Sequence, residues 1–193
     1  MKKDIGAKTL LFPTPVLIVA TYDVNGRPNA MNAAWGGICC SEPPCVTISL
    51  RKATYTYESL IKKKVYTINI PDKNYAAEAD YFGIASGRDE DKFMATRLTP
   101  IKSDIIDAPY IEEFQINLEC KVIHIAELGL HTQFVGQILN IKAERKLLEE
   151  GQPPMIEQIM PLIYSPDNRN YYTIGEKIGC AFSIGKKFIR NRR

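Results

Sequence analysis

Several stretches of the chain alternate apolar and polar residues with a period of two, the pattern of a β-strand with one buried face. Residues 46–50 (VTISL) and 65–70 (VYTINI) show this pattern most clearly. Residues 16–22 are instead apolar and β-branched almost without a break, which indicates a strand buried on both faces. Further strands are expected at 114–125, 132–141 and 171–174.

Turn residues connect the first strands. Asn25-Gly26 tolerates the positive φ of a tight hairpin, so residues 29–35 should run beside 16–22. After Pro43-Pro44, the strand 46–50 should lead into a short helix at 55–63.

The other segments carry weaker patterns. A second helix should start at Asp72 or Asn74, run to Phe82 and stop at Gly83. Two prolines should keep 94–113 irregular. The remaining segments give a short surface helix at 144–150, a loop at 151–154 and an undecided pattern at 155–164.

These elements predict a mainly β fold (β+α), because six or so strands, few helices and no alternating βαβ order favour an antiparallel barrel with peripheral helices. A length of 193 residues fits a single domain over 1–193, and 45% hydrophobic content can fill its core.

The net charge of +3 is unevenly distributed, since five Lys and Arg residues lie in the last eight positions. A basic tail, about 184–193, therefore follows a nearly neutral body, and no nucleic-acid-binding face is expected. The sequence contains no apolar run long enough to span a bilayer and no signal-peptide stretch. We therefore expect a cytoplasmic protein that is not inserted in a membrane.

The cysteines argue against a disulfide framework or a zinc site. They are odd in number and contain no Cys-x-x-Cys pair: Cys39, Cys40, Cys45, Cys120 and Cys180. Their apolar neighbours favour buried thiols. The two histidines, His124 and His131, lack nearby acidic partners, so no metal site is expected, and His124 should be structural.

The stretch 29–60 carries the candidate chemistry. Small residues around the single tryptophan, Trp35, would let a flat ligand lie against backbone amides. Farther on, a basic, hydroxyl-rich turn at the start of the expected helix would favour an anion; its residues are Arg51, Lys52, Thr54 and Thr56. A planar ring joined to one phosphate describes FMN. The alternative interpretation is a half-buried hairpin followed by a solvated turn.

The phosphate-binding motifs of other protein classes are absent. The sequence has neither G-x-G-x-x-G nor G-x-x-x-x-G-K-[ST], so it supports neither a Rossmann dinucleotide site nor a nucleotide hydrolase.

A series of short matches runs in order from about residue 10 to residue 175: Pro13-Thr14-Pro15-Val16, Asn25-Gly26-Arg27-Pro28-Asn29, Ala33-Ala34-Trp35, Pro43-Pro44, Tyr55-Thr56, Gly87-Arg88, Asp91-Lys92-Phe93, Leu118-Glu119-Cys120, and Gly129 with His131, Phe134 and Gly136. Together they resemble the flavin reductase-like, FMN-binding split-barrel family, and most closely its flavoredoxin branch. The resemblance implies a split β-barrel with Greek-key-like antiparallel strands. It also implies a homodimer with each flavin near the subunit interface.

The resemblance further implies which residues hold FMN. Those along the ring are Asn29, Met31, Asn32, Ala33, Ala34 and Trp35, and those around the ribityl phosphate are Ser49, Leu50, Arg51, Lys52, Ala53, Thr54, Tyr55 and Thr56. Lys92 and Phe93 would approach the flavin, where a cation stabilises the anionic reduced ring. His131 would be the catalytic residue, steering a substrate or delivering a proton, although a strand-initiating hydrogen bond explains it equally well.

Three functions remain open on this basis. The first is a flavoredoxin-like protein that carries out electron transfer or flavin reduction through bound FMN, with a redox partner protein. The second is an NAD(P)H-dependent FMN reductase that uses NADH or NADPH as a transient donor and supplies reduced flavin to a partner. The third is a β-barrel binding or assembly module without a redox role.

Overall fold

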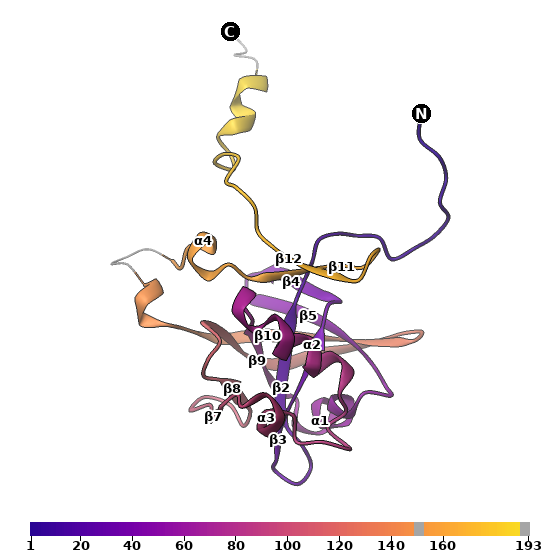
Figure 1. The fold of residues 1–193 in the computed structure, drawn as a ribbon, viewed down its shortest axis with the longest axis vertical. Coiled ribbons are helices and arrows are strands. Elements are labelled where there is room, and N and C mark those ends of the chain that lie inside the picture. The colour runs from indigo at the N-terminus through magenta and orange to yellow at the C-terminus, as the bar shows by residue number, and fades with distance from the viewer. Residues whose placement is uncertain (149–152, 190–193) are drawn as a thin grey trace.

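The computed structural model describes residues 1–148 and 153–189, and its main feature is a strongly curved antiparallel sheet (Figure 1). Its strands lie in the order β3-β2-β6-β9-β10-β5-β4. They are β2 (Leu17–Tyr22), β3 (Pro28–Ala33), β4 (Gly36–Ser41), β5 (Pro44–Arg51), β6 (Val65–Ile70), β9 (Ile116–Leu128) and β10 (His131–Ala143). The backbone N–H of Ser49 donates to the carbonyl of Trp35 at 2.8 Å, which holds the β3–β4 connection against β5.

Smaller elements surround this sheet. Three short strands form a second sheet and two form a hairpin: β1 (Thr14–Pro15), β11 (Leu162–Ser165) and β12 (Asn170–Thr173), then β7 (Pro100–Lys102) and β8 (Pro109–Ile111). The helices are α1 (Tyr55–Lys63), α2 (Ala76–Ile84), α3 (Lys92–Thr96) and α4 (Ile156–Ile159), with 3₁₀ turns η1 (Lys73–Tyr75), η2 (Arg145–Leu147) and η3 (Ile184–Phe188). The prediction of a mainly β fold with few helices is confirmed.

The core has two parts because β2 is buried on both faces. Leu17 and Val19 point into a cluster inside the curved sheet, together with residues of β5, β6 and β10. Ile18 and Ala20 point the other way, against α2, α3 and β11. This arrangement is the reason for the unbroken apolar run in the sequence.

The first hairpin forms as the sequence predicts. Gly26 takes a φ of +78°, and the carboxylate of Asp23 accepts hydrogen bonds from the backbone N–H groups of Asn25 and Arg27. The resulting register places Thr21 opposite Asn29 and brings β3 beside β2.

Several predicted boundaries were wrong. Helix α2 passes through Gly83 and ends at Ile84, because the N–H of Ala85 still bonds the Tyr81 carbonyl. The strand expected over 29–35 ends at Ala33, and β4 forms separately. The segment 94–113 is not irregular, since it holds the end of α3 and the β7–β8 hairpin. Its prolines, at the first positions of two edge strands, are compatible with pairing.

The C-terminal part also differs in detail. The helix expected over 144–150 is a single 3₁₀ turn, η2; residues 149 and 150, and 151–152 of the expected loop, lie outside the described residues. The undecided stretch 155–164 contains α4 followed by β11. Of the basic tail 184–193, only 184–189 is described.

The expectation of buried thiols was wrong for three of five cysteines. Cys45 and Cys120 are buried, but Cys39, Cys40 and Cys180 are exposed. Two of these lie on β4, the edge strand of the sheet, and the third lies in the C-terminal segment. His124 is also exposed, on β9.

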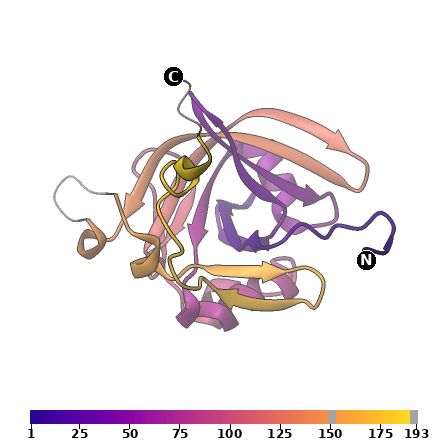
Figure 2. The ribbon, with the colours of Figure 1, turned by 90° about the horizontal axis from the view of Figure 1, so that it is seen from above.

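The C-terminal segment 174–189 leaves the body of the molecule as an extended arm that includes η3, seen from the side in Figure 1 and end-on in Figure 2. Its large apolar side chains are exposed: Ile178, Phe182, Ile184, Phe188 and Ile189. None of the helices in the described part of the chain is long and apolar enough to cross a membrane.

Candidate functional site

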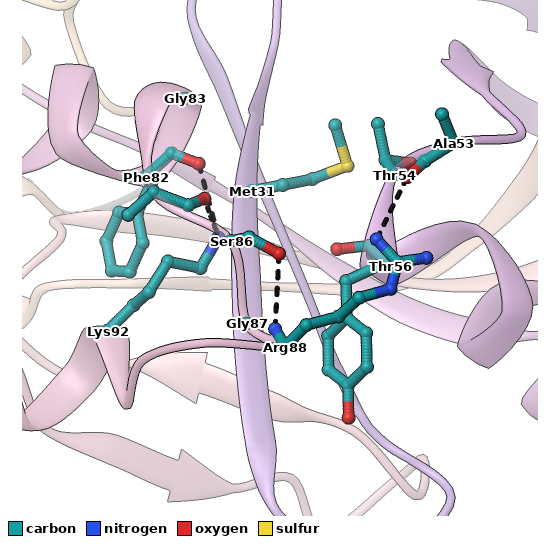
Figure 3. Close-up of a pocket in the computed structure, with 12 residues that line it drawn as sticks. Met31, Ala53, Thr54, Thr56, Phe82, Gly83, Ser86, Gly87, Arg88 and Lys92 are labelled. Atoms are coloured by element: carbon teal, nitrogen blue, oxygen red, sulfur yellow. Dashed lines mark hydrogen bonds between the residues drawn. The ribbon is translucent and has the colours of Figure 1, made fainter.

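A cavity of about 260 Å³ opens between the start of α1 and the end of α2 (Figure 3). The β5–α1 turn forms one wall, the segment after α2 forms the other, and Met31 of β3 projects between them. Its lining residues are Met31, Ala53, Thr54, Tyr55, Thr56, Phe82, Gly83, Ala85, Ser86, Gly87, Arg88 and Lys92.

The hydroxyl-rich wall is the first turn of α1. Thr54 is the N-cap residue, and its hydroxyl bonds the Arg51 carbonyl at 2.9 Å rather than capping the helix. Thr56 is buried and accepts a hydrogen bond from the amide of Asn29 at 2.9 Å. The first N–H groups of a helix have no intrahelical partner, so this turn offers donors to an anion.

Arg88 joins the same wall from a distant part of the chain. Its guanidinium donates to the Ala53 carbonyl at 3.0 Å and lies over the Tyr55 ring, 5.5 Å from the centroid. The Tyr55 hydroxyl in turn donates to Asp23 at 2.8 Å. Burial alone would raise the pKa of Asp23, but hydrogen bonds from Arg27, Tyr55 and Asn25 lower it below the ordinary value. A charged, fixed Asp23 therefore anchors the ring on which Arg88 rests.

Gly87 keeps the two walls close together. A Cβ at this position would collide with Oδ1 of Asn29 and would lie 2.6 Å from a ring carbon of Tyr55. Only glycine fits between β3 and α1 here, so the lack of a side chain at this position helps to shape the cavity.

Lys92 supplies a buried positive charge at the other wall. The residue is 4% exposed, and its ammonium donates to the carbonyls of Phe82 and Ala85, each at 3.3 Å (Figure 3). Both carbonyls belong to the C-terminal end of α2, where the helix dipole favours a cation. Burial lowers the pKa of Lys92 to about 8, and no acidic group within the described residues offsets this effect. Such a cation is suited to an anionic ligand.

A second, wider cavity of about 560 Å³ lies beside the first, and Gly83 lines both. Its walls carry aromatic rings and two arginines. Besides Gly83, the lining residues are Asn32, Ala34, Trp35, Arg51, Asp80, Ile84, Tyr164, Arg169 and Tyr171. The amide of Asn32 donates to the Ala79 carbonyl at 3.0 Å and to the Tyr171 hydroxyl at 3.3 Å. These bonds tie β3 to α2 and β12.

The residues named from the sequence are distributed over both cavities and their surroundings. Met31, Ala53, Thr54, Tyr55, Thr56 and Lys92 line the narrow cavity, and Asn32, Ala34, Trp35 and Arg51 line the wide one. Asn29 bonds Thr56 behind the narrow cavity, whereas Ala33, Leu50 and Phe93 are buried in the core. Ser49 lies on β5, Lys52 pairs with Glu127 at 2.6 Å, and His131 lies opposite Arg51 at the start of β10.

Several lining residues were not assigned to the site from the sequence: Gly83, Ser86, Gly87, Arg88, Tyr164, Arg169 and Tyr171. The family resemblance included the Gly87-Arg88 pair, so it was the sequence signal that could have placed these two residues in the site. The contacts that bring Arg88 to Ala53 and Tyr171 to Asn32 join residues far apart in the sequence, which local patterns do not reveal.

The donor set fits a flavin mononucleotide. The narrow cavity offers helix N–H groups, two threonine hydroxyls and Arg88 to a single phosphate. The small side chains of β3 and the buried Lys92 border the space in which a flat, electron-poor ring would lie.

Comparison with known proteins agrees with this assignment. The sequence pattern of the flavin reductase like domain matches residues 9–175. Flavoredoxin of Desulfovibrio vulgaris (Miyazaki F) is 49% identical, with a TM-score of 0.92 over 96% of this chain and 100% of that one. Flavoredoxin from Methanosarcina acetivorans is 27% identical, with a TM-score of 0.88 over 97% and 100%. The uncharacterized protein YddH of Escherichia coli (strain K12) is 26% identical over 176 residues, 89% of this chain and 93% of that protein.

These similarities confirm both the resemblance and the split-barrel fold expected from the sequence. The chain therefore belongs to the flavin reductase-like family.

Proposed function

We propose that the protein binds one FMN per chain and transfers electrons through it, as a flavoredoxin-like oxidoreductase. The observation that carries the proposal is Lys92, a buried ammonium without an acidic partner in the described residues, facing a hydroxyl-lined cavity. Similarity to two flavoredoxins supports the same class.

Bound FMN would supply the redox chemistry, which is hydride or electron transfer at its ring. The chain's own residues would bind and orient the cofactor. The α1 turn, Thr54, Thr56 and Arg88 would hold its phosphate, while Asn32, Ala34 and Trp35 would set the plane of the ring. Lys92 would stabilise negative charge that develops on the ring during reduction, because a nearby cation favours the more anionic state.

Two kinds of electron donor would suit this site, a nicotinamide nucleotide and a redox protein. The wide cavity, with Trp35, Arg51 and Arg169 in its walls, could admit an anionic, aromatic donor such as NADH or NADPH. It also gives a small redox partner protein access to the same ring. His131 remains a proposed catalytic residue, since it lies directly across from Arg51 at the edge of this region.

Stopped-flow reduction of the holoprotein separates the two donors. Loss of flavin absorbance on mixing with NADH or NADPH supports the flavin reductase activity. Loss only with a reduced protein donor such as a ferredoxin supports electron transfer. A protein purified without any flavin, and unable to take it up, would contradict both and favour a binding module.

We also propose that the protein is a homodimer and that the arm 174–189 contributes to the interface. Five large apolar side chains on this arm are exposed, and the arm extends away from its own domain (Figure 1). Isolated short helical turns are unstable in water, so η3 requires packing that a second chain would provide.

A further inference from the structure

The β4–β5 hairpin carries a cluster of thiols that the proposed flavin site does not use. Cys39 and Cys40 are exposed on β4, and Cys45 is buried near the start of β5. In the antiparallel register, Cys40 lies directly opposite Cys45. A register shift between Ile38 and Cys40 leaves Cys39 without a cross-strand partner.

This register suits a covalent bond between two of the three thiols. Directly opposed residues in an antiparallel pair have Cα atoms about 4.5–5.5 Å apart. Disulfides join residues whose Cα atoms are about 4.4–6.8 Å apart, so Cys40 and Cys45 need little backbone movement to be bridged.

The two thiols also differ in environment. The Cys40 thiol donates a hydrogen bond to the Glu42 carbonyl at 3.3 Å. It is solvent-exposed, so it is the thiol of the pair that a reagent reaches first. Burial raises the pKa of Cys45, and the neighbouring Cys40 and Cys39 raise it further. Cys45 is thus shielded from a bulky reagent but close to Cys40. Within residues 1–148 and 153–189, no group of three or more His, Cys, Asp or Glu side chains is arranged to hold a metal ion.

We propose that Cys40 and Cys45 are a reversible dithiol–disulfide pair that is oxidised by small organic disulfides. The Cys40 thiolate attacks one sulfur of the organic disulfide, whose S–S bond breaks and releases one thiolate. The Cys45 thiolate then attacks the Cys40 sulfur of the mixed disulfide and releases the second. Two protein thiols have lost two electrons and two protons, and the organic disulfide has gained them as two thiols.

The position of the pair links it to the wide cavity. Strand β4 begins directly after Trp35, and β5 ends at Arg51, so the bridged hairpin carries two residues of that cavity wall. The proposal does not depend on flavin binding, because thiol oxidation is measured by mass and not by redox activity.

The test is equilibration with increasing ratios of oxidised to reduced glutathione, followed by acid quenching, alkylation in denaturant and intact-mass measurement. Denaturant is needed because Cys45 and Cys120 are buried and must also react when they are reduced. The effective concentration of Cys45 near Cys40 favours the internal bond over glutathione adducts. We therefore expect two of the five thiols to become unreactive, without a glutathione adduct, at a ratio at least about tenfold below that which modifies Cys39 or Cys180.

Single variants identify the pair, because no Lys or Arg lies between residues 28 and 50 and trypsin leaves all three hairpin thiols in one peptide. Cys40→Ser and Cys45→Ala should each abolish the internal bond, whereas the matched controls Cys39→Ser and Cys180→Ser should retain it. Cys40→Ser changes an exposed residue, so it should remain folded by circular dichroism. Loss of the bond in Cys39→Ser, a disulfide between chains, or adducts forming first on the wild type would overturn the proposal.

Discussion

At the scale of single residues, the site is defined by a buried charge and by a missing side chain. Lys92 is held by helix carbonyls rather than by a carboxylate, which leaves its charge available to a ligand. Gly87 lets β3 and α1 approach so closely that a methyl group would not fit. Each feature leads to a prediction about the affinity for FMN.

The affinity for FMN should depend on pH through Lys92. With a pKa of about 8 in the free protein, Lys92 is charged below pH 8 and is progressively neutral above it. An anionic ligand prefers the charged form, so binding above pH 8 requires proton uptake, and affinity should fall by up to about tenfold per pH unit. Fluorescence titration from pH 7 to 9 measures this. Lys92→Met should bind FMN more weakly at pH 7 and show no such fall, and parallel profiles for both proteins would exclude the role.

Gly87→Ala should weaken FMN binding by at least about tenfold, because its Cβ would displace the Tyr55 ring in the cavity wall and Asn29 behind it. Gly37→Ala is the matched control, since a Cβ on Gly37 meets no atom within 4 Å. Flavin titration and thermal unfolding of both variants provide the comparison. Equal affinities would show that the wall adjusts without harming the site.

At the scale of elements, the side chain of Tyr66 on β6 lies against β10, because Gly136 leaves room for it. A Cβ on Gly136 would lie 2.1 Å from the Tyr66 hydroxyl oxygen and 2.8 Å from the ring carbon that bears it. That hydroxyl is buried and has no hydrogen-bond partner among the described residues. The contact between β6 and β10, which are not neighbours in the sheet, therefore depends on shape and not on a polar contact.

Gly136→Ala should lower the free energy of unfolding by about 1–3 kcal/mol through overpacking. Tyr66→Phe should change it little, because it removes an unsatisfied hydroxyl. The double variant should recover part of the loss, because it removes the contact with the hydroxyl but not the contact with the ring carbon. Urea unfolding of the apoproteins tests the coupling, and simple additivity of the two single effects would contradict this explanation.

The sequence predicted the elements and residues whose pattern is visible in the local sequence, and it missed those that depend on distant contacts. The strands of the main sheet were predictable because β5 and β6 each bury one face, and β2 buries both. Strand β4 was missed because an edge strand with both faces exposed shows no alternation, and β7 and β8 are too short to show a period. Thr54, Thr56 and Lys92, which line the narrow cavity, were named from the sequence through the hydroxyl-rich turn and the family resemblance. Arg88 was not, since its position depends on a contact with Ala53, 35 residues away.

At the scale of the whole molecule, the C-terminal arm extends away from the domain (Figure 1), and its large apolar side chains are exposed. If a second chain completes the flavin site, flavin binding and dimer formation must strengthen each other by the same free energy. Sedimentation of the apoprotein and holoprotein over a dilution series should therefore show a tighter holoprotein dimer. Phe182→Ser with Phe188→Ser, both exposed on the arm, should weaken the dimer; an unchanged dimer constant would exclude the arm from the interface.

The central claim is that this chain holds FMN, and the most direct measurement is the identity and amount of the flavin released from purified protein on heating. The narrow cavity provides hydroxyls and one arginine for a single phosphate, with no second phosphate-binding motif in the sequence. Chromatography with absorbance detection should therefore show one FMN per chain, or full occupancy after incubation with FMN. Release of FAD, or a protein that takes up no flavin at micromolar FMN, would contradict the account.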